Sequence, residues 1–252
     1  MKTKCCLIAV GGSGYKLKKD GIEFPYSKSS LQLLGKPMIH WLLEMLEETG
    51  IRKIVMTSER KDSLEFVRKV SNDFINNFDE ILFHQNSGFG FCGLPFQCKD
   101  FIDFPCFFEA GHSFNTPEHY EKMDKEYKKD CLIASGFPPK GHSPRNVIKI
   151  ENGKMKYIGM KFSIPGEIEV GSPKLFGEEF IDNLPRLGYD FSNILPYYIE
   201  NNKLKIVYSV MPLEADVKKE WNEAIPAYEE FIRNRRQLPR LSNIPINSSS
   251  SH

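Results

Sequence analysis

A glycine-rich turn and nearby lysines are the residues of this sequence best suited to chemistry on phosphate. The turn directly follows an apolar run over residues 5–10 and consists of Gly11, Gly12, Ser13 and Gly14. Glycines leave backbone N–H groups accessible to a polyanion, and lysines supply positive charge. The sequence therefore predicts a phosphate-binding loop, a feature shared by many nucleotide-binding folds.

The lysines that follow the turn have two interpretations. Residues 15–30 lack a sustained apolar period and contain turn formers, which predicts an irregular segment folding over the end of the first strand. Lys16, Lys18 and Lys19 either contact phosphate or form a solvated charged face. For Lys28 the alternatives are also phosphate contact and a solvated side chain.

The elements after the turn alternate between strands and helices. Apolar residues at helical spacing follow Pro37 and stop at Gly50, which predicts a helix, and residues 51–57 read as a second strand. A further amphipathic helix over 61–77 and a strand over 80–85 continue the pattern. This alternation predicts a doubly wound, three-layer α/β fold with a mostly parallel sheet.

A second glycine-dense stretch follows the strand that ends at Gln85. It covers residues 85–95 and is predicted to be a loop that includes Gly90 and Gly93. Ligands of open α/β sheets bind at the carboxyl ends of the strands. Both glycine-rich segments are therefore expected on one rim, as two walls of one pocket.

The second half of the chain has shorter elements. Asn152-Gly153 predicts a tight hairpin between the strands on either side of it. The expected strands cover residues 105–110, 130–135, 146–151, 155–161, 168–176 and 205–210, and the expected helices cover 117–129, 177–184 and 190–201.

Length and charge restrict the classes of partner. The 252 residues include 34 basic and 33 acidic side chains, so no overall field favours nucleic acid or a membrane surface. No window approaches the ~20 apolar residues of a membrane span, and no secretory leader is expected. We expect a cytosolic protein with reduced cysteines, one domain over residues 1–236 and a disordered tail over 237–252.

The motifs together resemble those of the sugar-phosphate nucleotidyltransferases, the NDP-sugar pyrophosphorylases. That family has G-G-x-G-T-R-L after its first strand, then P-K, then G-K-P. Residues 11–17, Ser27-Lys28 and Gly35-Lys36-Pro37 stand in matching register. This register favours a phosphate-binding role for Lys28.

The resemblance continues to about residue 236. It implies that Gln85 and Gly90 read the nucleobase, that Gly93, Lys161 and Gly171 contact the acceptor, and that Lys16 and Lys28 neutralise phosphate charge. Residues 1–115 would form the nucleotide-binding half and residues 116–236 the acceptor-binding half. Metal ligands are expected at His112, where the family has aspartate, and at Asp216, which is also suited to capping a following helix.

The resemblance implies a fold of the Rossmann-like, glycosyltransferase-A type and a role in nucleotide-sugar biosynthesis. In the implied reaction, a phosphorylated acceptor, most simply a sugar-1-phosphate, attacks the α-phosphorus of an NTP and pyrophosphate leaves. Mg²⁺ would assist, or Mn²⁺ if His112 is a ligand. The implied partners are the two substrates and, in addition, a second copy in a homo-oligomer, with no nucleic acid and no membrane.

Departures from the family pattern leave other functions open. Tyr15-Lys16 replaces Thr-Arg, Met160 replaces the glutamate before Lys161, and His112 replaces aspartate. A homologue that binds nucleotide without turnover is the first alternative. A glycosyltransferase is the second, although the stretch Glu109-Ala110-Gly111-His112 lacks the D-x-D pair of that class. His112 is either a metal ligand or only the end of a strand.

Overall fold

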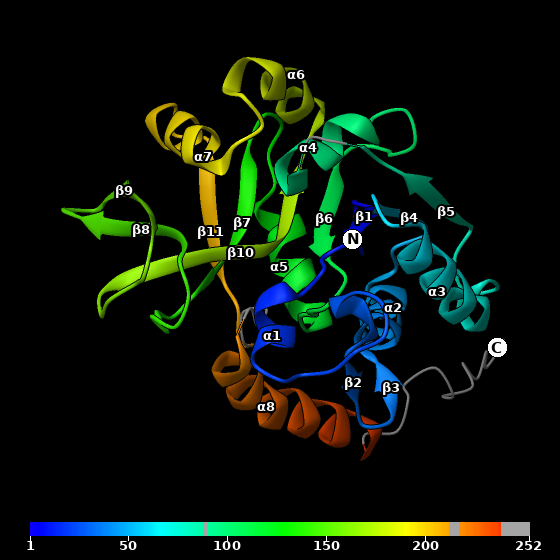
Figure 1. Ribbon diagram of the computed structural model, residues 1–252. Coiled ribbons are helices and arrows are strands. Elements are labelled where there is room, and N and C mark those ends of the chain that lie inside the picture. The colour runs from blue at the N-terminus through cyan, green and yellow to red at the C-terminus, as the bar shows by residue number, and fades with distance from the viewer. Residues whose placement is uncertain (88–89, 212–216, 238–252) are drawn as a thin grey trace, which may run out of the picture.

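The computed structural model describes residues 1–87, 90–211 and 217–237. In this part of the chain, nine strands form one mixed sheet with the order β11-β7-β10-β6-β1-β4-β5, and the β8–β9 hairpin joins it through β10 (Figure 1). Two short strands, β2 and β3, pair separately. The expected sheet, mixed and mostly parallel, is confirmed.

Most strands of the large sheet run in one direction. These are β1 (Cys5–Ala9), β4 (Lys53–Ser58), β5 (Glu80–Gln85), β6 (Cys106–Ala110), β7 (Leu132–Phe137) and β11 (Leu204–Tyr208). β8 (Arg145–Glu151) shares this direction, whereas β9 (Lys154–Lys161) and β10 (Glu167–Phe176) run in the opposite direction. The separate pair is β2 (Gln32–Leu33) with β3 (Lys36–Pro37). Because β10 lies antiparallel between β6 and β7, the carboxyl ends of the parallel strands share one edge.

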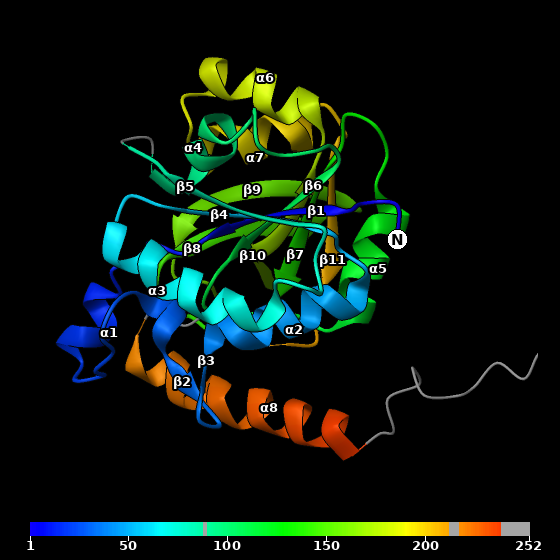
Figure 2. The same cartoon turned by 90° about the vertical axis from the view of Figure 1, so that its right-hand side faces the viewer.

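Helices cover both faces of the sheet, which confirms the three-layer prediction. The helices are α1 (Tyr15–Lys19), α2 (Met38–Thr49), α3 (Lys61–Ser71), α4 (Gly90–Gln97), α5 (Pro117–Glu126), α6 (Glu178–Leu187), α7 (Phe191–Glu200) and α8 (Lys218–Gln237). Figure 2 shows α4, α6 and α7 on one side of the sheet and α2, α3 and α8 on the other.

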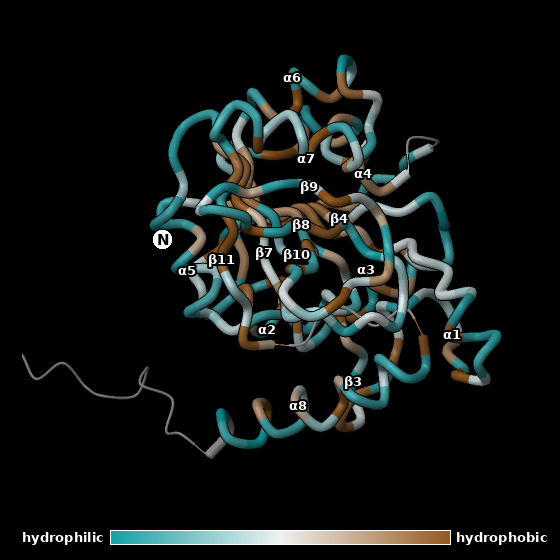
Figure 3. The backbone as a smooth tube through the Cα atoms, turned by 90° about the vertical axis from the view of Figure 1, so that its left-hand side faces the viewer, coloured by the Kyte–Doolittle hydropathy of each residue, from teal (hydrophilic) through white to brown (hydrophobic). Residues whose placement is uncertain are grey.

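The central strand explains why the first apolar run has no alternation. Cys5 and Leu7 pack into the core beneath α4, α6 and α7, whereas Cys6 and Ile8 pack into the core beneath α2, α3 and α5. A strand buried on both faces needs apolar residues at every position. The hydrophobic colouring accordingly concentrates in the strands (Figure 3).

The first β–α–β unit forms as the sequence predicts. Pro37 precedes α2 with a φ of −67°, and the helix ends at Gly50, whose left-handed φ of 79° favours glycine. The chain then enters β4, which pairs parallel with β1. Similarly, the hairpin prediction is confirmed: Asn152 and Gly153 have φ values of 51° and 75° between β8 and β9.

Two segments differ from the expected structure. Residues 15–30 were predicted to be irregular, yet Tyr15–Lys19 forms α1 and Lys28–Ser30 forms a turn of 3-10 helix. Buried Leu17 anchors α1 to the core, and five residues are too few for a helical period to show in the sequence. The loop predicted over residues 85–95 includes residues 90–95, which instead belong to α4.

The cysteines are free thiols, as expected. Cys5, Cys6, Cys98 and Cys106 are buried and the other two are half-buried. In the part of the chain that the structure describes, no helix is both long enough and apolar enough to cross a membrane. The assignment of residues 1–236 to one domain with two halves stays a prediction.

A buried histidine makes the stability of the fold depend on pH. The His119 side chain lies in the core with Nε2 2.8 Å from the Ser135 hydroxyl. Burial, with Lys122 nearby, lowers the pKa of His119 from 6.5 to about 4. The unfolded chain therefore binds the proton first as pH falls, so the free energy of unfolding should drop by up to about 3 kcal/mol between pH 6.5 and pH 4.

Urea denaturation across this pH range checks the expectation. In His119→Gln, which keeps a polar side chain without a titration, the slope of stability against pH should be shallower between pH 4 and 6.5. Equal slopes in the variant and the wild type would contradict a neutral, buried His119.

Candidate functional site

The carboxyl end of β1 opens into the predicted glycine loop. The loop lies between two neighbouring strands: the Val10 N–H donates to the Thr57 carbonyl at 2.9 Å, and the Gly111 N–H donates to the Ala9 carbonyl at 2.8 Å. A Cβ at Gly11 would lie 2.6 Å from the Ser58 Oγ, so a side chain there would have to displace Ser58. The glycine loop, which has no bulky side chain, therefore lies where β1, β4 and β6 end.

Lys28 lies along this loop. Its backbone N–H donates to the Gly12 carbonyl at 3.0 Å, and its Cε is 3.5 Å from the position that a Cβ on Gly12 would take. Gly14 has a left-handed φ of 61°, and a Cβ there would lie 2.8 Å from the Lys28 Cγ. Lys28 is not a solvated side chain, which was one of its two interpretations: only 8% of its surface is exposed.

The burial of Lys28 makes it a preorganised cation. A lysine held by its own methylenes against a glycine loop loses less rotamer freedom on meeting an anion than a lysine in solvent. Lys16, the other expected phosphate-binding lysine, is exposed on α1. The structure thus places Lys28 against Gly12 and Gly14, and leaves Lys16 at the surface.

The end of β6 joins the same rim. The backbone of Gly111 packs against Val10 and against Ser29, whose Oγ would be 2.6 Å from a Cβ at Gly111. The half-buried His112 follows. These contacts bring the segment of His112 next to the glycine loop and to the turn that carries Lys28.

The expected metal site has few ligands among the described residues. No group of three or more histidine, cysteine or acidic side chains there is placed to hold a metal ion. Glu109 is buried, and its carboxylate accepts hydrogen bonds from Tyr120 at 2.8 Å and from Ser113 at 3.2 Å. Asp216, the second expected ligand, lies outside the described residues.

The expected base-reading residues lie on β5 and α4. Gln85 ends β5 with an exposed amide whose Nε2 is 3.4 Å from the Glu59 carbonyl. Gly90 begins α4 with a left-handed φ of 59° and open space where a Cβ would be, whereas Gly93 is buried inside the helix. β5 and β1 are parallel and flank β4, so Gln85 and the glycine loop share the carboxyl edge.

The expected acceptor residues lie on β9 and β10. Lys161 ends β9, and its ammonium is 2.6 Å from a carboxylate oxygen of Glu167 on β10. This ammonium holds the pKa of Glu167 below its usual value. Gly171 lies in β10, at the start of a β-bulge that ends at Lys174. The described ion pair of Lys161 is therefore with β10 rather than with the glycine loop.

Sequence reasoning missed a buried lysine in β10. Lys174 is 4% exposed; its ammonium donates to the Gly171 carbonyl at 3.1 Å and lies 4.5 Å from the ring centre of Phe191 and 5.8 Å from that of Phe91. All ten residues of β10 are buried. A charged residue inside such a strand is the signal that would have marked Lys174.

Solved structures match the chain over most of its length. The inositol-1-phosphate CTP transferase from T. maritima has a TM-score of 0.72 at 12% identity, and the match covers 95% of this chain and 99% of that one. HddC from Yersinia pseudotuberculosis has a TM-score of 0.67 at 15% identity, covering 90% and 100%. The chain has the fold of the sugar-phosphate nucleotidyltransferases. No family model and no curated protein sequence matches it.

A third structure extends the agreement in fold. A protein described as a glucose-1-phosphate thymidylyltransferase from Bacillus anthracis has a TM-score of 0.70 at 15% identity, with 90% of this chain and 95% of that chain covered. Each of the three matches covers at least 90% of this chain. The resemblance that the sequence motifs indicate is thus confirmed for the fold.

Gly12 offers a test of the loop that leaves the fold intact. It is exposed, and an added Cβ would meet only the Lys28 Cε, at an ordinary contact distance of 3.5 Å. Gly12→Ala should therefore keep the stability of the wild type within ~0.5 kcal/mol. Because the methyl group would occupy the backbone surface that the sequence predicts to bind phosphate, we expect nucleotide affinity to fall roughly tenfold by calorimetry.

Gly11→Val is the matched contrast. Its side chain would push on Ser58 from within the loop, so it should lower both the melting temperature and nucleotide affinity. Wild-type affinity in Gly12→Ala, with an unchanged melting temperature, would place the nucleotide elsewhere.

Proposed function

We propose that this protein transfers a nucleoside monophosphate from an NTP to a small phosphorylated acceptor and releases pyrophosphate. An acceptor phosphate oxygen attacks the α-phosphorus, the new P–O bond forms, and the bond from the α-phosphorus to the bridging oxygen breaks. Such transfers depend mainly on positioning and on charge neutralisation. The acceptor we favour is a sugar-1-phosphate.

One observation carries this proposal: a buried lysine lies along a glycine-rich loop at the carboxyl edge of the sheet. The loop backbone at residues 11–14 offers N–H groups to the phosphates, and Lys28 supplies a compact cation beside them. Lys16 would add charge from α1. The fold shared with nucleotidyltransferases supports this reading.

We further propose roles for the remaining residues. Gln85, Gly90 and Gly93 would contact the nucleobase side of the NTP, and Lys161 and Gly171 would contact the acceptor. Mg²⁺, or Mn²⁺, would neutralise triphosphate charge when bound, with Asp216 and His112 as the residues proposed to contact it. Mg²⁺ commonly uses only one or two protein carboxylates together with phosphate oxygens.

Pyrophosphate release tests the proposal directly. The purified protein is incubated with each of CTP, dTTP, UTP, GTP and ATP against inositol-1-phosphate, glucose-1-phosphate and phosphocholine, with Mg²⁺ or Mn²⁺. One NTP and one acceptor should together give pyrophosphate, and omission of the acceptor should abolish the signal. No pyrophosphate from any pair, with no nucleotide binding by calorimetry, would overturn the proposal.

His112 favours a second candidate function. At the position where the resemblance implies aspartate, an imidazole brings no negative charge to a cation. The protein would then be a nucleotide-binding regulator without turnover. Nucleotide binding with no pyrophosphate in the wild type, and pyrophosphate release in His112→Asp, would select this second function over the first.

A further inference from the structure

The edge strand β11 leaves part of its backbone without a strand partner in the described chain. β11 is the last strand on its side of the sheet. Its ladder to β7 uses the Lys203 carbonyl, which accepts from Leu132 at 2.9 Å, and the Ser209 N–H, which donates to Gly136 at 3.0 Å. Since residues of a parallel ladder alternate in direction, the N–H and C=O groups of Ile206 point away from β7.

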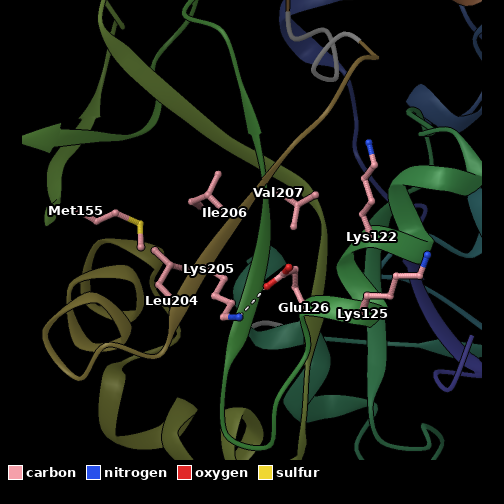
Figure 4. A pocket seen from close by; sticks show the side chains of 8 residues that line it. All are labelled: Lys122, Lys125, Glu126, Met155, Leu204, Lys205, Ile206 and Val207. Carbon is pink, nitrogen blue, oxygen red and sulfur yellow. Dashed lines mark hydrogen bonds and ion pairs between the residues drawn. The ribbon is translucent and has the colours of Figure 1, made fainter. Parts of the chain in front are cut away.

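A hollow of about 550 Å³ lies along this edge (Figure 4). α5 forms one wall with Lys122 and Lys125, and Met155 of β9 lies on the opposite side. Residues 204–207 of β11 lie between them. The hollow thus follows a sheet edge and has room for an extended segment beside it.

The two sides of the hollow differ in chemistry. Leu204 and Ile206 belong with Met155 to the apolar core on one face of the sheet. On the other face, Lys205 pairs with Glu126 of α5 at 2.7 Å, and Lys122 and Lys125 stand on the same helix. Neither Lys122 nor Lys125 has an ion pair within the described residues, so this face carries excess positive charge.

We propose that β11 is a docking site for an extended acidic segment of a partner protein. The segment adds to the sheet as a strand through the outward N–H and C=O groups of Ile206 and the β11 residues that precede it. Side chains of a strand alternate between faces, so its acidic residues meet Lys122 and Lys125 while its apolar residues meet Met155 and Ile206. The recognised sequence therefore alternates acidic and apolar residues.

Charge argues against a second copy of this chain as the occupant. Pairing of β11 with β11 of another copy would bring two sets of Lys122 and Lys125 towards one edge. Like charges across an interface disfavour it, whereas an acidic segment neutralises the excess charge. Lysines on edge strands also prevent unwanted strand pairing. If neither peptide binds in the test below, the lysines have only this protective role.

The test uses a fluorescein-labelled peptide with the sequence Glu-Val-Asp-Ile-Glu-Val-Asp and the full-length protein. Fluorescence anisotropy should show saturable binding of this peptide. A peptide of the same charge with proline in place of its valines and isoleucine cannot form a strand, and it should bind at least tenfold more weakly. Equal binding of the two peptides, or no binding of either, would overturn the proposal.

Two variants locate the site. Ile206→Pro removes the outward N–H and the side chain, whereas Ile206→Ala removes only the side chain beyond Cβ, and neither touches the ladder to β7. Affinity in the proline variant should be at least tenfold weaker than in the alanine variant. Lys122→Glu with Lys125→Glu, both exposed on α5, should weaken binding to a similar extent.

Sedimentation velocity tests whether a second copy of this chain, rather than an acidic partner, occupies the β11 edge. The wild type should have the same oligomeric state as Ile206→Pro in the absence of peptide. A wild-type dimer that becomes a monomer in Ile206→Pro would assign the edge to a second copy and overturn the acidic partner. Because these measurements need no nucleotide, they are independent of the proposed transferase activity.

Discussion

Lys28→Met is expected to lower the turnover of nucleotidyl transfer at least ~100-fold, which corresponds to about 2.7 kcal/mol of lost transition-state stabilisation. The methionine keeps the aliphatic length that packs along Gly12 and Gly14, and it removes only the charge. The free energy of unfolding should therefore stay within ~1 kcal/mol of the wild type. Initial rates of pyrophosphate release and urea denaturation measure the two quantities on the same preparation.

Lys19→Met is the matched control. Lys19 ends α1, in the segment that also carries Lys28, and is exposed. Its replacement should leave turnover unchanged, which excludes a general effect of lost positive charge.

Lys16→Met decides between the two interpretations of Lys16. A clear loss of rate would indicate that Lys16 contacts phosphate, and a wild-type rate would indicate that it is solvated. A wild-type rate in Lys28→Met would remove Lys28 from the mechanism.

Much of the fold is predictable because burial and backbone conformation determine which residue types occur at particular positions. The strand Cys5–Ala9 is apolar at successive positions because Cys5 and Cys6 enter opposite cores. α2 ends at Gly50, where a left-handed backbone favours glycine. Such positions have one dominant local cause, so residue type alone indicates the structure.

α4 was missed because its helix is decided by tertiary packing. Its residues are apolar on most sides, so no helical period separates it from a glycine-rich loop. Phe91 stacks on Phe108 of β6 with ring centres 4.5 Å apart. The burial against β6 and α6 that holds this segment helical comes from residues distant in sequence.

The candidate site is predictable in its residue types but less so in its environment. The motif register selects Gly11–Gly14 and Lys28, and the structure puts them in contact. The burial of Lys28 depends on how the turn after Ser27 folds onto the loop, which no local pattern specifies. Asp216, the second expected metal ligand, lies outside the described residues, so its role stays a proposal.

A buried ion pair that links β8 to α8 carries the second large prediction. Arg145 Nη2 is 2.9 Å from Glu220 Oε2, and the side chains are 10% and 4% exposed. The Ser143 hydroxyl donates to the other carboxylate oxygen at 2.5 Å. Glu220→Ala should lower the free energy of unfolding by ~3–5 kcal/mol, because it leaves the Arg145 charge buried without this carboxylate.

A double-mutant cycle, measured by urea denaturation, isolates the contribution of the Arg145–Glu220 interaction to the free energy of unfolding. The cycle compares Arg145→Met, Glu220→Leu and the double variant. The double variant removes both charges while filling similar volume, so it should recover most of the stability that either single variant loses. Glu151→Ala breaks the exposed pair with Lys149, whose side chains are 47% and 44% exposed, and should cost less than ~1 kcal/mol. A loss below ~1 kcal/mol in Glu220→Ala would show that α8 does not depend on this ion pair.

The Arg145–Glu220 pair lies next to the elements that we propose bind the acceptor. Glu220 stands in the first turn of α8, shortly after Asp216 in the chain, and Arg145 begins β8, which pairs with β9 and β10. Glu220→Ala at a temperature where it remains folded should therefore raise the KM for the acceptor more than the KM for the NTP. Equal changes in the two KM values would mean that the pair supports the fold without favouring the acceptor side.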